Sequence, residues 1–208
     1  MISTGNSGYH HVVTGSAKFY DRLSFLYPVI DLFLRSSKRK FFQKINSYPP
    51  GSLLEVGVGN GKHLKYYTTH DVTGIDTSQG MLSRARTAAG INIRLLQMNG
   101  EELSFPDEVF DYVVMSHVIA VVQDPEKLLE EVFRVLKPEG KVFILNHFTP
   151  DNWLGHVDRA SEKLARLLHF RSIFTISGLN AIRKFKLLSE CTAGMFSYFK
   201  ILIYEKKI

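Results

Sequence analysis

The sequence predicts an α/β fold built on a doubly wound sheet, mostly parallel, that closes with an antiparallel C-terminal strand. Three observations support this prediction. Strand-like and helix-like segments alternate along the chain, a glycine-rich turn follows the first strand-like run, and two β-rich runs stand near the end. Strands that alternate with helices run parallel, because each helical crossover returns the chain to the same end of the sheet.

Five short apolar runs, rich in β-branched residues, are typical of buried parallel strands. They are residues 53–58, 72–76, 93–98, 110–116 and 141–148. A closing antiparallel pair is expected further on, because two β-rich runs are separated there by Gly194 and Ser197. These two runs are residues 187–195 and 199–205.

The clearest helical pattern covers residues 125–136, with leucines and valines on one face and charged residues on the other. Asp124 is the expected N-cap, and Pro125 the expected first helical residue. The Lys-Pro-Glu-Gly sequence of residues 137–140 is expected to end this helix and to turn the chain into the next strand.

Length and composition fit a single globular domain, because the chain has 208 residues of which 45% are hydrophobic. No apolar run approaches the roughly 20 residues that cross a bilayer. The N-terminus lacks the basic and apolar regions of a secretory signal, so we expect a cytoplasmic chain. Cys191 stands alone and the eight histidines show no metal-ligand spacing, so we expect neither a disulfide nor a metal site.

The net charge of +6 is unevenly distributed along the chain. Lys and Arg outnumber Asp and Glu by seven to two in residues 1–50 and by ten to five in residues 151–208. In residues 51–150 there are nine basic residues against thirteen acidic ones. Two basic ends favour an anionic partner, such as a membrane surface, a phosphate-bearing substrate or a nucleic acid.

The glycine-rich turn ends the sequence Leu-Leu-Glu-Val-Gly-Val-Gly-Asn-Gly of residues 53–61, and a helix is expected to follow it. Glycines let the backbone approach a ligand, and a helix N-terminus offers N–H groups to it. Dinucleotide-binding enzymes have G-x-G-x-x-G here, but Lys62 occupies the third glycine position, and Glu55 stands two residues before the first glycine. A carboxylate so close opposes a pyrophosphate and attracts a cation, which disfavours a nicotinamide dehydrogenase and predicts a cationic ligand.

Further candidate binding residues follow the next two strands. Asp76 ends the second strand, about twenty residues after the turn, where an acidic side chain accepts hydrogen bonds from both ribose hydroxyls. Asn99 follows the third strand as a hydrogen-bonding group on the adenine side, with Met81 as an apolar cover for the ring. All lie at the carboxyl ends of strands, where ligands bind to open α/β sheets.

These segments resemble the ordered motifs of class I S-adenosylmethionine-dependent methyltransferases, whose fold is Rossmann-like. The resemblance covers about residues 50–148. It rests on residues 55–61, Asp76, residues 99–105, and Phe110-Asp111 with residues 135–140. It implies S-adenosyl-L-methionine as cofactor and S-adenosyl-L-homocysteine as product. Many members have Asp where Asn99 stands and Gly where Glu139 stands.

By this resemblance, Glu55 and Gly57 lie near the methionine part of the cofactor, Asp76 holds the ribose, and the loop from Asn99 borders the adenine. The implied cofactor-binding residues are Glu55, Gly57, Gly59, Gly61, Asp76, Thr77, Met81, Asn99, Gly100, Glu101 and Ser116. The single domain, 1–208, then divides into an N-terminal helical lid (1–48), a cofactor-binding core (49–148), and a substrate-side helix with the closing strands (149–208).

A narrower resemblance concerns the acceptor. Residues 19–22 (Phe-Tyr-Asp-Arg), 121–127 and 145–148 (Leu-Asn-His-Phe) are similar to segments of bacterial phosphatidylethanolamine N-methyltransferases, to which quinone-ring methyltransferases are related. We therefore expect N-methylation of an amine headgroup. The alternatives are C- or O-methylation of a quinone-like or other small apolar acceptor, and a noncatalytic cofactor-binding protein.

Three candidate catalytic residues are Tyr20, His117 and His147. Methyl transfer depends mainly on placing the acceptor against the methyl group, but an amine acceptor must lose a proton. His117 and His147 follow the fourth and fifth strands and can contact the acceptor or act as a base, although either can equally be a structural histidine. Tyr20 can cover the cofactor or orient the acceptor.

Two segments are candidates for peripheral membrane contact. Residues 19–45 combine apolar residues with a basic end, and residues 154–171 carry a stripe of basic and titratable residues at helical spacing. The stripe consists of His156, Arg159, Lys163 and Arg166. Both segments can instead be packed helices with solvated polar faces. A nucleic-acid acceptor is disfavoured, because Ser-His-Val-Ile at residues 116–119 replaces a base-flipping Asn-Pro-Pro-Tyr-like sequence.

Overall fold

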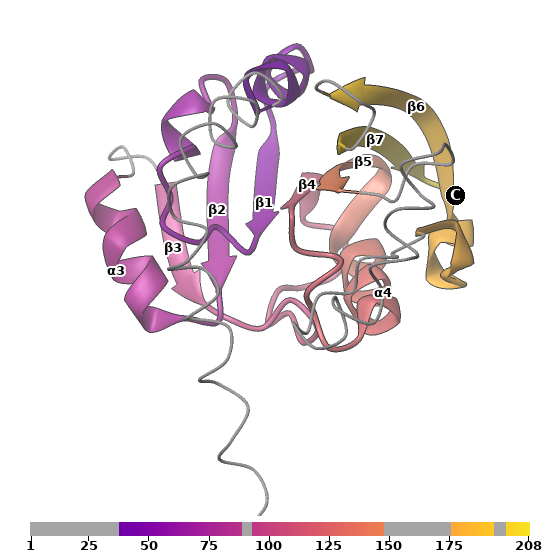
Figure 1. Cartoon of the computed structure of the whole chain (residues 1–208). Coiled ribbons are helices and arrows are strands. Elements are labelled where there is room, and N and C mark those ends of the chain that lie inside the picture. Colours follow the sequence, from indigo (N-terminus) through magenta and orange to yellow (C-terminus); the bar gives the residue numbers. More distant parts are fainter. Residues whose placement is uncertain (1–37, 89–92, 148–175, 194–198) are drawn as a thin grey trace, which may run out of the picture.

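The computed structural model of this protein describes residues 38–88, 93–147, 176–193 and 199–208. Tyr20, most of segment 19–45, and all of segment 154–171 lie outside these residues. The described chain forms one seven-stranded sheet with helices on both faces (Figure 1). No helix in the described part is long and apolar enough to span a bilayer.

The sheet is parallel except where the chain ends, as the sequence predicts. Its spatial order is β3-β2-β1-β4-β5-β7-β6, and Figure 1 shows β3 and β6 at opposite edges. The parallel strands are β1 (Ser52–Val56), β2 (Asp71–Asp76), β3 (Ile93–Gln97), β4 (Phe110–Ser116) and β5 (Leu136–His147). The hairpin of β6 (Phe185–Ala193) and β7 (Phe199–Lys206) places β7 antiparallel to both β5 and β6. The predicted fold class is confirmed.

The strand order changes direction at the centre of the sheet. From β1 the chain moves outward to β2 and β3, whereas β4 returns to the other side of β1 and β5 follows it. Crossovers on the two sides of such a point leave a crevice at the carboxyl ends of the central strands. The fold therefore has a ligand crevice beyond the ends of β1 and β4.

One face of the sheet is covered by helix α4 (Pro125–Val135). Its apolar side, which includes Leu128 and Val132, is buried against the sheet. The predicted N-cap is present, because the Asp124 carboxylate accepts a hydrogen bond from the backbone N–H of Lys127 at 3.0 Å. The helix therefore begins where its sequence signals predict.

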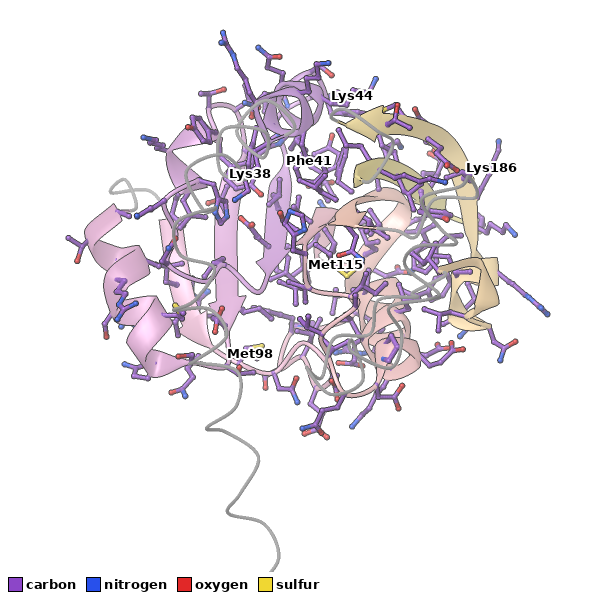
Figure 2. The ribbon with its side chains drawn as sticks, viewed as in Figure 1. Lys38, Phe41, Lys44, Met98, Met115 and Lys186 are labelled. Atoms are coloured by element: carbon purple, nitrogen blue, oxygen red, sulfur yellow. The ribbon has the colours of Figure 1, made fainter. Side chains whose placement is uncertain are left out.

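The opposite face is covered by helix 38–46 and by α3 (Gln79–Ala88). Phe41, Phe42 and Ile45 of helix 38–46 are buried, and Figure 2 shows Phe41 directed toward the sheet and Lys44 on the outer side of that helix. Strand residues alternate between the two faces, so that Leu53 packs on this side and Leu54 on the side of α4.

The helix expected after the glycine-rich turn is not formed. Only the single 3-10 turn η2 (Leu64–Tyr66) stands between β1 and β2. Nine residues separate Gly61 from Asp71, and the Tyr-Tyr-Thr-Thr sequence of residues 66–69 has low helix propensity. The site is therefore without the extended helix N-terminus that the sequence suggested.

The end of α4 also differs from the prediction. The helix ends at Val135, and Leu136 already pairs with Phe110 as the first residue of β5. The Lys-Pro-Glu-Gly sequence of residues 137–140 thus lies within an irregular part of this strand rather than in a separate turn. Glu139 provides the bend, because its φ of 60° is in the left-handed region.

Candidate active site

A cavity of about 470 Å³ opens at the carboxyl ends of the central parallel strands. Segments following β1, β2, β3 and β4 each contribute to its wall. Eight of the residues singled out from the sequence line it: Gly57, Asp76, Thr77, Asn99, Gly100, Glu101, Ser116 and His117. Residues far apart in the sequence thus meet where the strand order predicts a ligand site.

Gly57 lets the chain turn sharply out of β1. Its φ is +74°, and a Cβ atom placed on it would lie 2.4 Å from Cγ2 of Val118, which also lines the cavity. A side chain would therefore be strained by its backbone conformation and would collide with the loop after β4. The position requires glycine because the two segments approach each other so closely.

Asp76 is held in a fixed orientation at the end of β2. One carboxylate oxygen accepts the backbone N–H of Gly59 at 2.8 Å, and the other accepts that of Ser78 at 2.8 Å. A carboxylate has about four acceptor positions, so each oxygen keeps capacity for another donor. This arrangement suits a side chain that receives two hydroxyl groups of a ligand.

The loop after β3 forms the next part of the wall. The Asn99 side-chain oxygen accepts the backbone N–H of Glu101 at 3.1 Å, which closes a tight turn. Glu101 is only 8% exposed, and its carboxylate accepts the backbone N–H groups of Gln123 at 2.8 Å and Asp124 at 3.2 Å. Glu101 therefore joins this loop to the one before α4, in addition to lining the cavity.

His117, Val118 and residues 121–123 form another part of the wall. His117 has a φ of +61° and donates its backbone N–H to the carbonyl oxygen of Leu145 at 2.7 Å. Val118, Val121 and Val122 give this wall an apolar surface, and Val121 is 76% exposed. The sequence analysis named Val121 and Val122 only within segment 121–127 and gave these valines no place in the site, although an apolar run directly after a strand end is a signal for them.

Glu55 lies on the other face of β1 and is not among the residues lining the cavity. Its side chain is completely buried, and Oε1 lies 2.7 Å from Nε2 of His63. The second oxygen, Oε2, and the Tyr67 hydroxyl are both buried without a hydrogen bond of standard geometry, but these two side chains interact with each other. Burial, together with the negative charge of Glu55, raises the pKa of Tyr67 well above its ordinary value.

The remaining candidates lie at different places. Gly59 and Gly61 are in the turn after β1 and Met81 is exposed on α3, and none of the three lines the cavity. His147 is the last residue of β5, where its backbone pairs with that of Phe199. Their proposed contacts with the cofactor or the acceptor remain predictions.

The chemistry of the site fits a ligand that carries hydroxyl groups and positive charge. Asp76 offers acceptor capacity at the cavity, and Glu55 adds a buried carboxylate two residues before the first glycine of the turn. A buried carboxylate oxygen is stabilised when a cationic donor reaches it. In the described residues, no group of three or more His, Cys, Asp or Glu side chains is arranged to hold a metal ion.

Comparisons with known proteins agree with this geometry. Residues 54–144 match the family model described as a methyltransferase domain. The phosphatidylethanolamine N-methyltransferase of Cereibacter sphaeroides is 36% identical over 164 residues, which cover 76% of this chain and 81% of that protein. The demethylmenaquinone methyltransferase of Bacillus licheniformis is 29% identical over 194 residues, covering 89% of this chain and 79% of that protein.

The fold also resembles that of solved methyltransferase structures. An S-adenosylmethionine-dependent methyltransferase from Thermotoga maritima superposes with a TM-score of 0.66 at 21% identity, covering 91% of this chain and 99% of that one. At this identity the likeness concerns the fold alone. Together with the sequence relatives, it shows that the chain belongs to the class I methyltransferase family and is an enzyme that uses S-adenosyl-L-methionine as its cofactor.

Proposed function

We propose that this enzyme transfers a methyl group to the amine headgroup of an amphiphile such as phosphatidylethanolamine. The observation that carries the proposal is the 36% identity with a phosphatidylethanolamine N-methyltransferase over 81% of that protein's length. The second candidate is methylation of a quinone-like or other small apolar acceptor at carbon or oxygen. It is supported by the longer match to a demethylmenaquinone methyltransferase and by the exposed valines beside the cavity.

In this proposal, each part of the site lies near one part of the cofactor. Asp76 accepts the ribose hydroxyls with Thr77 beside it, and Asn99 borders the adenine. Glu55 and the glycine-rich turn, including Gly57, lie toward the amino-acid end. When bound, S-adenosyl-L-methionine supplies a methyl group activated by its sulfonium charge.

Of the candidate acceptor-side residues, His117 is the one whose side chain the structure describes. An amine attacks only as the neutral base, so a headgroup that arrives as ammonium must lose a proton. His117 lines the cavity directly after β4. We propose that it contacts the acceptor or takes this proton, with Tyr20 and His147 as further acceptor-side candidates.

A basic outer surface supports docking to an anionic membrane. Arg39, Lys40 and Lys44 are exposed on helix 38–46, and no described residue forms an ion pair with them. From residue 38 to residue 70 the only acidic side chain is Glu55, which is buried. Unpaired basic residues near a bilayer each add about 1 kcal/mol of attraction to anionic lipid, so this surface suits a lipid acceptor.

The experiment that tests the proposed acceptor uses cofactor carrying a labelled methyl group. The enzyme is incubated with vesicles of phosphatidylethanolamine and phosphatidylglycerol, with an extract of demethylated quinone, and with small RNA, and label is followed in each product. Label in the phospholipid headgroup supports the proposal. Label confined to the quinone fraction supports the second candidate and overturns the first, and label confined to RNA overturns both.

Charge variants separate membrane docking from the chemistry. R39Q/K40Q/K44Q removes three positive charges from helix 38–46, and R84Q/R86Q/R94Q removes three exposed charges from α3 and β3. We expect only the first variant to lose vesicle binding in a flotation assay, with methylation of a short-chain, water-soluble acceptor retained. Equal loss in both variants would mean that net charge, and not this surface, drives docking.

A further inference from the structure

The loop after β4 carries one apolar side chain that the fold does not use. Residues 118–122 form the apolar run Val-Ile-Ala-Val-Val. Ile119 is buried, and every other member of the run except Val121 packs against the same core. Val121 is 76% exposed, yet it lines the cavity. A single exposed valine is ordinary on a protein surface, but this one lies where a ligand cavity opens to solvent.

The backbone that carries Val121 is held on both sides. Before it, His117 donates its N–H to a carbonyl oxygen of β5 at 2.7 Å, and Val121 itself donates its N–H to the carbonyl oxygen of Val118 at 2.9 Å. After it, Gln123 donates its N–H to the Glu101 carboxylate at 2.8 Å. The side chain is therefore presented at a fixed place in the wall, as a contact that selects a ligand requires.

The wall around Val121 suits apolar and cationic groups. Asp76 and Glu101 contribute the carboxylates of the cavity, and no Lys or Arg of the described chain lines it. A wall of this kind favours a ligand whose parts are apolar or positively charged, and it offers no ion pair to a phosphate. The apolar surface at the opening is thus its main means of holding an uncharged part of a ligand.

The sheet order separates Val121 from the residues assigned to the cofactor. In the proposed function, the cofactor lies against segments that follow β1, β2 and β3, with Gly57, Asp76 and Asn99 as examples. Val121 follows β4, which lies on the other side of β1 from β2 and β3. The acceptor has to approach the methyl group from a side that the cofactor leaves open. The loop after β4 lies on such a side.

We propose that Val121 is a specificity-determining residue for the methyl acceptor, and that its side chain contacts the apolar part of that acceptor. The inference rests on the proposed function only in requiring an acceptor with an apolar part, which the amphiphilic amine and the quinone-like compound both have. A polar side chain at position 121 then weakens selection of the apolar acceptor and leaves cofactor binding unchanged.

Steady-state methylation by the full-length enzyme tests this inference with two ethanolamine acceptors. One is dihexanoyl phosphatidylethanolamine, used below its micelle concentration, and the other is glycerophosphoethanolamine, which has the same headgroup and no acyl chains. V121T keeps the shape of the side chain but exchanges a methyl group for a hydroxyl. We expect it to lower kcat/KM for the dihexanoyl acceptor about tenfold relative to the chain-free one, and V121I to keep the wild-type preference.

Two controls separate acceptor contact from other effects. L188T makes an apolar-to-polar change at an exposed position of β6, at the edge of the sheet, and should keep the wild-type preference. Calorimetric titration with S-adenosyl-L-methionine, without acceptor, should give V121T the wild-type affinity. An unchanged acceptor preference in V121T, or a loss of cofactor affinity as large as the loss in kcat/KM, would overturn the inference.

Failure of the proposed headgroup is a separate result. If the wild type methylates neither ethanolamine compound, the proposed N-methylation fails, and the same variants are compared on a demethylated quinone with a short prenyl chain. V121T should then raise the KM for the quinone about tenfold, and an unchanged KM would overturn the inference about Val121. Methylation of neither class of acceptor would overturn it together with both proposed functions.

Discussion

The Glu101 carboxylate accepts a hydrogen bond from the backbone N–H of Gln123 at 2.8 Å and so links two parts of the cavity wall. The same oxygen also accepts the N–H of Asp124, the N-cap of α4. The loop after β3 and the start of α4 thus share one buried side chain. The sequence analysis placed Glu101 beside the adenine, and the structure gives it this further role.

Replacing Glu101 should loosen one wall of the cavity. E101A leaves two backbone N–H groups without their acceptor, so we expect the unfolding free energy to fall by about 1–3 kcal/mol. Hydrogen exchange should become faster at Gln123 and Asp124 in particular, and cofactor binding should weaken. E101Q retains an acceptor oxygen and should lie between E101A and the wild type.

Glu102 provides the matched control for this prediction. It forms an exposed ion pair with Lys127 and is 71% exposed. Exposed pairs contribute little to stability, so E102Q should unfold at the wild-type temperature. If E101A showed no faster exchange at Gln123, the hydrogen bond between Gln123 and Glu101 would not stabilise the cavity wall.

Local sequence signals account for much of the fold. The cap and apolar face of α4 are encoded within a dozen residues, and Asp124 with Pro125 marks its first turn. The strand conformation around Glu139 could not be predicted in this way. Nothing in the Lys-Pro-Glu-Gly sequence shows that it joins β5, because that depends on Leu136 pairing with the distant Phe110.

The residues of the site show the same difference between local sequence patterns and contacts that form only on folding. Asp76 and Gly57 could be selected from the sequence because a strand end next to a glycine-rich turn is a local pattern. The contacts of Glu55 with His63 and of Glu101 with Gln123 could not, because both link segments that meet only in the folded chain. A short polar pattern therefore indicates where the cavity lies, but not which side chains hold its walls.

A side chain at position 57 should disrupt the cavity. G57A introduces a Cβ atom 2.4 Å from Val118 at a φ of +74°, so we expect a loss of at least about 2 kcal/mol in unfolding free energy and severe loss of cofactor binding. Adding V118A should restore part of the stability by relieving the collision, leaving the backbone strain in place. Urea denaturation and calorimetric titration measure both effects.

Gly80, in the first turn of α3, is the control for the effect of adding a methyl group. A Cβ atom there has only the Ser78 hydroxyl oxygen nearby, at 3.8 Å. Alanine is favoured over glycine in a helix by about 0.5–1 kcal/mol, so G80A should be neutral or stabilising. Destabilisation of G57A no larger than that of G80A would contradict the close approach of Gly57 to Val118.

Glu139 should be replaceable by glycine with a gain in stability. A left-handed conformation costs a residue with a Cβ atom about 1–2 kcal/mol, and the greater chain entropy of glycine offsets part of the gain. We expect E139G to stabilise the protein by about 0.5–1 kcal/mol in urea denaturation. E139A removes the carboxylate but keeps the strained Cβ, so it should show no such gain. Equal stability of the two variants would exclude backbone strain as the cause.

The hydrogen-bond network of Asp111 predicts how stability depends on pH. Burial raises the pKa of this carboxyl, but hydrogen bonds from Lys137 and Ser52 outweigh that effect and hold the pKa below its ordinary value. A lowered pKa in the folded state means that the stabilisation is complete above about pH 4 and is lost as the pH falls through the folded-state pKa.

The difference in unfolding free energy between the wild type and D111N should therefore be constant near neutral pH and shrink below about pH 4. Chemical denaturation of both proteins across this range measures it. Asn can keep an acceptor oxygen for Ser52 but loses the charge and the acceptor for Lys137, so the pH dependence of the difference reports the ionisation of Asp111. A difference that stayed constant to the lowest pH at which both proteins fold would show that Lys137 and Ser52 do not lower this pKa.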